Sequence, residues 1–322
     1  MTRYLSMVAV PVLLALYLPF CAADVKLVLA PDVAPPESLW VEPENLERAD
    51  LFHGPWGLEY APDPKATYQI IERKHTGINP GVTLVDPLGR EWSVKQPSLD
   101  EPVAEGPIEV VLSRVLSAIG YHQPPVFYQE TVTVDDDWGL HTEPGGRFRL
   151  KLKVLKDRGS WSWQQNPHVG TRPYQGLLVV LLMFNSSDLK NDNNTIYEYR
   201  RTEPAERWLV VRDLGTALGS SGRFAPRKGD PRAFQREPFI TGIRGGFVEF
   251  HYQGWHRELV DRRITPADVA WASNLLSRLS ARQWHEAFRA GGYSPAAAAP
   301  FIDRLREKVA DGQRLAIAAP TS

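Results

Sequence analysis

The sequence predicts an α+β protein in which a small, mixed β part precedes a larger, mainly helical part. Short apolar runs with strand character gather between residues 82 and 155, each bounded by turn-forming residues. From Thr265 onward the apolar residues recur with helical spacing instead. With 322 residues the chain is long enough for one large domain or for two lobes that share a cleft. We assign residues 61–155 to a small lobe and residues 156–316 to a large lobe.

The small lobe is predicted to hold two strand pairs and one helix. In the first turn, proline stands at the second position and glycine at the fourth, as a tight turn between paired strands prefers. Pro107 opens the helix and Gly120 ends it. The predicted elements are strand 82–85, turn 86–89, strand 90–95, helix 108–119, and strands 126–134 and 148–155.

The large lobe is predicted to be built around one buried helix. Residues 174–184 are apolar on nearly every side, which is typical of a helix that is enclosed by protein. Residues 196–199 and 208–211 pair plausibly as a hairpin. Helical periodicity returns in residues 267–279 and 301–309, and an Ala/Pro-rich stretch separates these two helices.

The N-terminus is typical of an exported protein. Arg3 precedes the apolar stretch from Met7 to Leu18, and Cys21-Ala22-Ala23 offers small residues for cleavage. We predict a signal peptide over residues 1–23 and a periplasmic or secreted protein. The alternative is an uncleaved N-terminal membrane anchor, because the apolar run is about long enough to span a bilayer. Residues 24–60 are rich in proline and acidic residues, which indicates an extended arm.

The amino-acid composition of the chain argues against several classes of binding partner and modification. The formal net charge is -1, so no global field attracts nucleic acid or an anionic membrane surface. Cys21 is the only cysteine, and cleavage after Ala23 would leave a chain without a disulfide. Two glycosylation acceptor patterns, at Asn185 and Asn193, fall where we place the active centre. A glycan would block that site, so a bacterial origin fits better than a eukaryotic secretory one.

Four polar segments carry the chemistry that the sequence indicates. Lys95 ends a strand, and Glu109 follows it by 14 residues in a helix. The run from Asp188 to Asn193 follows the buried helix, and Asp213-Leu214-Gly215 follows a strand. Phosphoryl transfer needs a cation on the phosphates, an acid that holds this cation, metal ligands, and a carboxylate near the acceptor hydroxyl. The chain offers each of these groups.

These segments resemble the motifs of protein kinases. The run from Asp188 to Asn193 is similar to the kinase catalytic loop, and Asp213-Leu214-Gly215 is similar to the Asp-Phe-Gly element, with Leu for Phe. Residues 77–95 look closer to the atypical HipA-like kinases, and the arrangement also resembles secretory-pathway and spore-coat kinases. The resemblance covers most of residues 77–215. It departs from the family pattern in three places: no Gly-x-Gly-x-x-Gly loop precedes Lys95, Ser186-Ser187 replaces the usual His-Arg, and the hairpin between the two motifs is longer than usual.

The resemblance implies a two-lobed protein-kinase-like fold that binds ATP and Mg²⁺ or Mn²⁺. Lys95 would contact the ATP phosphates, and Glu109 would hold Lys95 in place. Asn193 and Asp213 would bind the metal ion.

The resemblance also implies two catalytic residues. Asp188 would orient the acceptor hydroxyl or accept its proton, and Lys190 would neutralise charge on the transferred phosphoryl group. The predicted function is transfer of the γ-phosphate of ATP to a hydroxyl of a protein or small molecule. Two alternatives stay open: a catalytically weak, kinase-like protein that binds a nucleotide or a partner, and transfer of the nucleotide instead of the phosphate.

Overall fold

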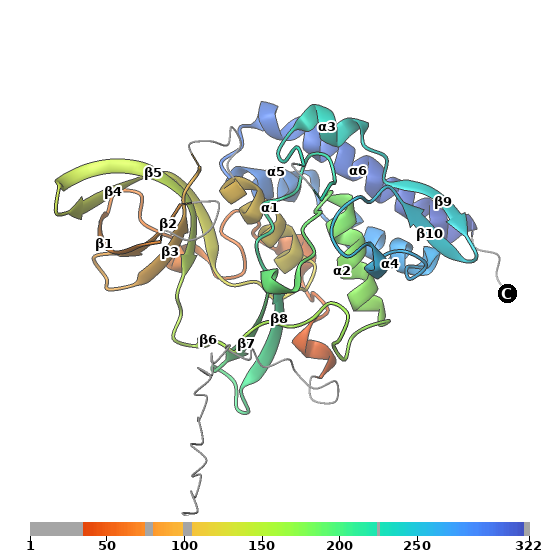
Figure 1. Ribbon diagram of the computed structural model, residues 1–322, viewed down its shortest axis with the longest axis horizontal. Helices are drawn as coiled ribbons and strands as arrows, with labels where there is room; N and C mark the ends of the chain where they lie inside the picture. The colour runs from red at the N-terminus through yellow and green to blue at the C-terminus, as the bar shows by residue number, and fades with distance from the viewer. Residues whose placement is uncertain (1–34, 75–79, 99–104, 224–225, 319–322) are drawn as a thin grey trace, which may run out of the picture.

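The computed structural model places a β-rich part at one end of the molecule and a group of packed helices at the other (Figure 1). It describes residues 35–74, 80–98, 105–223 and 226–318. The predicted signal peptide and the first part of the predicted arm lie outside these residues. Within them, no helix is both long and apolar enough to cross a membrane. The mixed α and β composition is as predicted, whereas the two-lobed kinase-like fold stays a prediction.

The β-rich part is a closed barrel of five strands in the order β1-β2-β3-β5-β4. Closure depends on β1, which pairs antiparallel with β2 and parallel with β4. The interior is filled by apolar side chains such as Tyr68, Trp92 and Phe148. The predicted strands 82–85, 90–95 and 126–134 are confirmed as β2, β3 and β4. Strand β1 was not predicted, and β5 begins at Gly139 and ends at Leu150 instead of covering residues 148–155. The strands are β1 (Thr67–Lys74), β2 (Gly81–Val85), β3 (Glu91–Lys95), β4 (Val126–Asp136) and β5 (Gly139–Leu150).

Helix α1 (Glu105–Ala118) joins the barrel to the helices. Ile108, Leu112 and Val115 recur at helical spacing and are buried in the main core of the helical part. The helix begins at Glu105, ahead of the start predicted from Pro107, because proline is tolerated anywhere in the first turn. This earlier start brings one additional carboxylate into the first turn.

The helical part is built around α2 (Arg172–Met183), whose residues from Tyr174 onward are all buried. Helix α6 (Pro295–Ala318) begins within the Ala/Pro-rich stretch that was predicted to separate two helices. That prediction is wrong because alanine has the highest helix propensity and Pro295 stands at the first position, where no hydrogen bond is lost. The remaining helices are α3 (Pro231–Arg236), α4 (Pro266–Ser277) and α5 (Ala281–Ala290).

Two small sheets complete the fold. The predicted hairpin is confirmed as β7 (Asn194–Tyr199) and β8 (Glu206–Val211), and β6 (Leu155–Asp157) pairs with β7. Strands β9 (Ile240–Arg244) and β10 (Phe247–Phe250) form a separate hairpin.

The described part of the predicted arm packs on the helical part. Leu39, Leu46 and Leu51 are buried in the main core. The indole of Trp40 donates a hydrogen bond to the backbone oxygen of Ile119 at 2.7 Å. These contacts hold the segment against the end of α1.

Lys308 of α6 is fully buried and supports the end of α2. Its amine lies 2.8 Å from the backbone oxygen of Met183 and 2.7 Å from Oδ1 of Asn185. The amine also lies 4.2 Å from the ring centre of Phe234. Burial lowers the pKa of this amine well below its usual value. Lys308 therefore donates to the carbonyl oxygen of Met183, the last residue of α2, which has no acceptor role within the helix.

We expect Lys308→Met to lower the free energy of unfolding by about 3 kcal/mol, because it leaves two buried oxygen atoms without a donor. Urea unfolding measures the change. Arg306→Met, on the exposed side of the same helix, is the matched control and should have little effect. Equal stability of Lys308→Met and the wild type would contradict this role.

Candidate functional site

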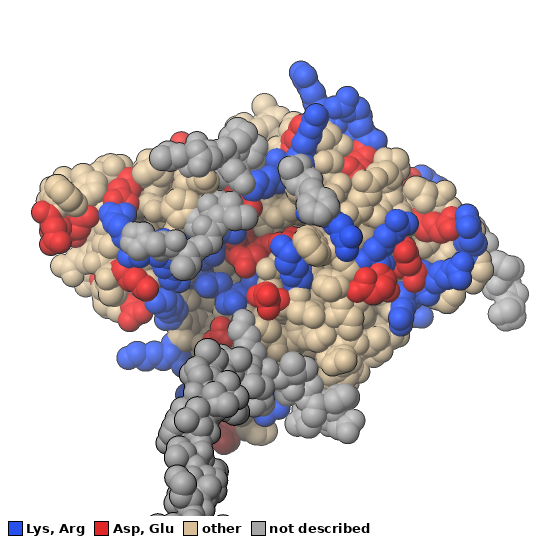
Figure 2. Space-filling model, in the orientation of Figure 1, with Lys and Arg blue, Asp and Glu red and all other residues tan. Residues whose placement is uncertain are grey.

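A cleft of about 820 Å³ lies where the barrel meets the helical part. This volume is within the range of roughly 300–1,000 Å³ that small-molecule sites occupy. In Figure 2, Lys and Arg side chains gather on the barrel side of this region, with acidic side chains near its centre. Cations outnumber acids among the lining residues, so the cleft favours an anionic ligand. The charged lining residues are Lys74, Lys95, Arg147, Arg149, Lys190, Arg223 and Lys228, with Glu105, Asp188 and Asp213.

The segment that carries Asp188 turns sharply out of α2. Asn185 adopts a left-handed conformation with φ of 54°, which asparagine tolerates better than most residues. Hydrogen bonds join this turn to the segment that follows Asp213. The segment that carries Asp188 and the segment that follows Asp213 therefore lie side by side. The bonds run from the Leu218 N–H to the Phe184 oxygen (2.8 Å), from the Ser187 N–H to the Thr216 oxygen (3.3 Å), and from the Asn185 side-chain amide to the Gly219 oxygen (2.6 Å).

The β7–β8 hairpin brings Asp213 close to Asn193. Asn194 pairs with Val211 at the base of the hairpin, and the Arg212 N–H donates to the Asn193 oxygen at 2.8 Å. Asp213 follows directly, in a left-handed conformation with φ of 53°. Such a conformation costs a non-glycine residue about 1–2 kcal/mol and is concentrated at functional sites.

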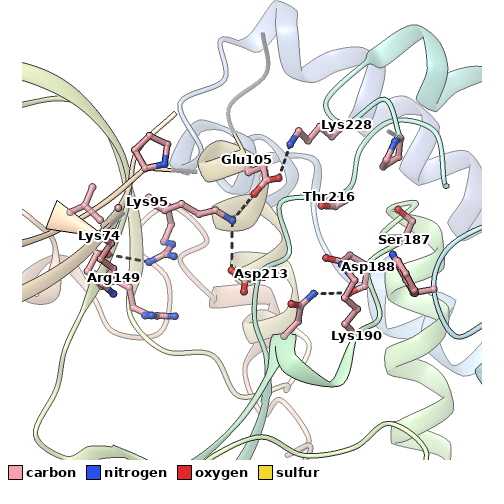
Figure 3. A pocket seen from close by; sticks show the side chains of 18 of the residues that line it. Lys74, Lys95, Glu105, Arg149, Ser187, Asp188, Lys190, Asp213, Thr216 and Lys228 are labelled. Atoms are coloured by element: carbon pink, nitrogen blue, oxygen red, sulfur yellow. Dashed lines mark hydrogen bonds and ion pairs between the residues drawn. The ribbon is translucent and has the colours of Figure 1, made fainter. Parts of the chain in front are cut away.

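Four charged side chains meet at the centre of the cleft (Figure 3). The amine of Lys95 lies 2.5 Å from a carboxylate oxygen of Glu105 and 3.6 Å from one of Asp213. The other oxygen of Glu105 lies 2.6 Å from the amine of Lys228. Burial opposes the charge of Lys95, but the carboxylates of Glu109, Glu105 and Asp213 raise its pKa. Burial likewise opposes the charge of Glu105, whose pKa is lowered chiefly by Lys95 and Lys228.

Gly215 allows the loop after Asp213 to lie close to Glu105. A Cβ on Gly215 would lie 2.4 Å from the Cβ of Glu105, so a side chain there would push the loop after Asp213 away from α1. The third residue of Asp213-Leu214-Gly215 is therefore required by packing against the first turn of α1.

The predicted partner of Lys95 is corrected by the structure. Glu109 lies one turn further along α1, where its carboxylate is 3.0 Å from Nε of Arg147, and both side chains are buried. Glu105 makes the direct ion pair with Lys95. Glu109 still contributes to the raised pKa of Lys95, but without contact.

Asp188 and Lys190 lie on the side of the cleft away from the barrel (Figure 3), and Asn193 lines the same cleft. The amine of Lys190 is 2.9 Å from Oδ1 of Asp188 and 5.0 Å from the ring centre of Trp255. The side-chain amide of Asn193 donates to the backbone oxygen of Asp188 at 2.8 Å. The structure therefore places all the predicted site residues except Glu109 in the lining of one cleft.

The donor atoms at the base of the cleft fit a hard divalent cation. Asn193 uses its nitrogen for the hydrogen bond to Asp188, which leaves its amide oxygen available as a ligand. The carboxylate of Asp213 is 46% exposed and faces the same cleft. Mg²⁺ prefers one or two such protein oxygens and completes its shell with water and phosphate.

A second group of possible metal ligands lies on the β4–β5 hairpin. Asp136, His141 and Glu143 offer ligand atoms within 4.8 Å of one another. Arg73 already forms ion pairs with Asp136 and Glu143, at 3.3 and 2.5 Å. Because the guanidinium already pairs with both carboxylates, we assign this cluster a structural role.

Several lining residues are absent from the sequence-based prediction. Lys228 lies outside the regular elements, and no spacing rule ties it to Glu105. Arg147 and Arg149 alternate along β5 and face the cleft, which a closer reading of the alternation in this strand could have indicated.

No family model matches the chain, and no curated protein matches it in sequence. Among solved structures, the proinflammatory kinase CtkA of Helicobacter pylori is similar, with a TM-score of 0.44 and 14% identity. The match covers 79% of this chain and 97% of that one. A similarity this weak carries no information about function.

We expect Glu105→Gln to lower the free energy of unfolding at neutral pH by about 2 kcal/mol, because two partly buried lysines lose a shared carboxylate. The pKa of Glu105 is lowered in the folded state. Its contribution is therefore present above the usual glutamate pKa of 4.5 and is lost as the pH falls through the folded value.

Urea unfolding of the wild type and of Glu105→Gln between neutral and acidic pH measures this difference. Glu91→Gln, which removes an exposed carboxylate 3.3 Å from Lys151, is the control and should change stability little. A difference between wild type and Glu105→Gln that stays constant down to acidic pH would contradict the ion pairs.

Proposed function

We propose that the protein is a phosphotransferase that moves the γ-phosphate of ATP to a hydroxyl of a protein or small molecule. The observation that supports this most strongly is the convergence of Lys95, Asp188, Asn193 and Asp213 on one cleft. These residues come from three separate parts of the chain, and each has the chemistry that one step of phosphoryl transfer needs.

Lys95 supplies the cation for the phosphates of the nucleotide. Its ion pair with Glu105 fixes the amine before the ligand arrives, which lowers the entropic cost of binding. Glu105 is therefore the acid that holds the amine of Lys95 in place, the role that was predicted from the sequence for Glu109.

Asn193 and Asp213 are the residues that would hold Mg²⁺ or Mn²⁺. When bound, the ion would neutralise charge on the phosphate oxygens. Asp213 also lies 3.6 Å from the amine of Lys95, so the phosphate-binding group and the metal ligand are adjacent.

Asp188 is the group that would orient the acceptor hydroxyl. The acceptor oxygen forms a bond to the γ-phosphorus, and the bond between that phosphorus and the β–γ bridging oxygen breaks, so the electron pair leaves with ADP. The hydroxyl proton goes to Asp188. Lys190, 2.9 Å from Asp188, is placed to compensate negative charge at this end of the cleft.

We further propose that the protein is exported, on the basis of the N-terminal segment. Sequencing the N-terminus of the chain recovered outside the cytoplasm tests this: a start at Asp24 supports cleavage, and a start at Met1 supports an anchor.

Incubation of the protein with Mg²⁺ and ATP labelled at either the α or the γ position tests the reaction. We expect only the γ label to move to an acceptor, and Asp188→Asn to slow this transfer by about 100-fold while nucleotide binding persists. Movement of the α label instead would indicate nucleotidyl transfer. Nucleotide binding without movement of either label would indicate a binding protein.

We expect Mg²⁺ and ATP together to raise the melting temperature of the wild type, because a ligand that binds only the folded state stabilises it. Asp213→Asn should lose most of this increase, since it removes the anionic metal ligand. Asp192→Asn is the matched control, because Asp192 is exposed and does not line the cleft. Equal increases in both variants would remove Asp213 from the metal site.

A further inference from the structure

Trp255 forms part of the cleft wall next to the segment that carries Asp188. Its backbone N–H donates to the backbone oxygen of Ser187 at 2.9 Å. The hydroxyl of Tyr252 donates to the backbone oxygen of Trp255 at 2.7 Å and lies 3.3 Å from that of Ser187. A Cβ at Gly254 would lie 2.4 Å from the Ser187 oxygen, so glycine allows the two segments to lie this close. The indole is therefore held beside the residue to which the proposed function assigns the acceptor hydroxyl.

Two cations lie over this indole. The amine of Lys190 is 5.0 Å from the ring centre, and the guanidinium carbon of Arg223 is 5.2 Å from it. Because both lie this close to one point, the amine and the guanidinium carbon are no more than about 10 Å apart. Lys190 is itself 2.9 Å from the carboxylate of Asp188. Arg223 therefore lies at the end of the cleft where the acceptor hydroxyl would bind.

The charge of Arg223 has no anionic partner. Its side chain forms no ion pair and no hydrogen bond with any residue in the described part of the chain. Lys190, by contrast, forms an ion pair with Asp188. The contact with the indole orients the guanidinium and leaves its planar donors available. A carboxylate matches those donors with two parallel hydrogen bonds.

The segment that carries Arg223 is anchored at its base. The Ser220 N–H donates to the backbone oxygen of Arg227 at 2.9 Å, and the Arg227 N–H donates to the hydroxyl of Ser220 at 3.1 Å. The Ser221 N–H donates to the buried carboxylate of Glu237 at 2.7 Å. Arg223 follows this anchor by two residues, which restricts the positions that its guanidinium can reach.

The position of Arg223 favours an anion on the acceptor over an anion on the nucleotide. Lys95 and Asp213, which would bind the phosphates and the metal ion, lie nearer the barrel than Asp188 and Lys190 do (Figure 3). Arg223 lies close to Lys190 through the shared indole. We therefore assign its anionic partner to the acceptor.

We propose that Arg223 selects an acceptor polypeptide that has an acidic side chain within three residues of the hydroxyl that receives the phosphate. This inference rests on the proposed function, which places that hydroxyl at Asp188. An extended chain advances about 3.3–3.6 Å per residue, so three residues span about 10 Å, the greatest separation between the cations of Lys190 and Arg223. Because Arg223 lines the cleft and is also exposed, a polypeptide that contacts it can continue out of the cleft.

Fluorescence polarisation of labelled peptides with the full chain, Mg²⁺ and a non-hydrolysable ATP analogue tests this selection. Each peptide has one serine, with Glu, Gln or Lys at the second and third positions on both sides of it. We expect the Glu peptide to bind about tenfold more tightly than the Gln peptide, because it gains a charge-assisted contact. Arg223→Gln should remove this preference, and Arg223→Glu should reverse it in favour of the Lys peptide.

Arg227→Gln is the matched control. Arg227 lies in the same segment and carries the same charge, but it does not line the cleft. This variant should keep the preference for the Glu peptide within about twofold of the wild type. An equal loss of preference in Arg223→Gln and Arg227→Gln would overturn the inference.

Transfer of the γ label from ATP then gives the KM for the peptide and the KM for ATP separately. We expect Arg223→Gln to raise the KM for the Glu peptide by about tenfold and to leave the KM for ATP unchanged. Equal affinity of the wild type for the Glu and Gln peptides would overturn the inference. So would no binding of any peptide, or an effect of Arg223→Gln on the KM for ATP alone. If the Glu peptide binds through Arg223 but no γ label moves, the peptide site stands and the proposed function fails.

Discussion

The cleft depends on the backbone pairing between the chain that leaves α2 and the chain that leaves β8. Leu218 donates to Phe184, and Arg212 donates to Asn193, so two segments about 20 to 35 residues apart in sequence become one unit. This pairing places the carboxylates of Asp188 and Asp213 in the same cleft. Without it, the two motifs would be separate loops with no shared chemistry.

The helical part supports these two paired segments through Lys308 of α6. Lys308 reaches across from α6 to the last turn of α2, and the same Asn185 that accepts its hydrogen bond donates to Gly219 in the second segment. Lys308 lies outside the cleft, yet it is linked to both functional segments through one side chain. A buried amine is costly to desolvate, so its retention at this junction is consistent with a need for precise placement of Asp188.

Much of the site was predictable from the sequence, because each motif follows a strongly patterned element. The buried helix and the β7–β8 hairpin are visible as apolar runs, and they fix where Asp188 and Asp213 lie. The partner of Lys95 was not predictable, since Glu105 and Glu109 share one helix face and only the position of the first turn decides between them. Strand β1 was missed because only its Tyr68 is buried while most of its residues are exposed. The role of Lys228 could not be predicted, because no pattern in the sequence ties it to Glu105 and only a tertiary contact brings the two together.

One cleft therefore contains both a lysine that is held by Glu105 and a pair of oxygen atoms, from Asn193 and Asp213, that would hold a metal ion. A crystal structure of the protein with Mg²⁺ and a non-hydrolysable ATP analogue tests the central assignment most directly. The account predicts that the carboxylate of Asp213 and the amide oxygen of Asn193 bind the ion and that the amine of Lys95 contacts a phosphate oxygen. A nucleotide bound outside the cleft, or an ion in the cleft that neither side chain contacts, would contradict it.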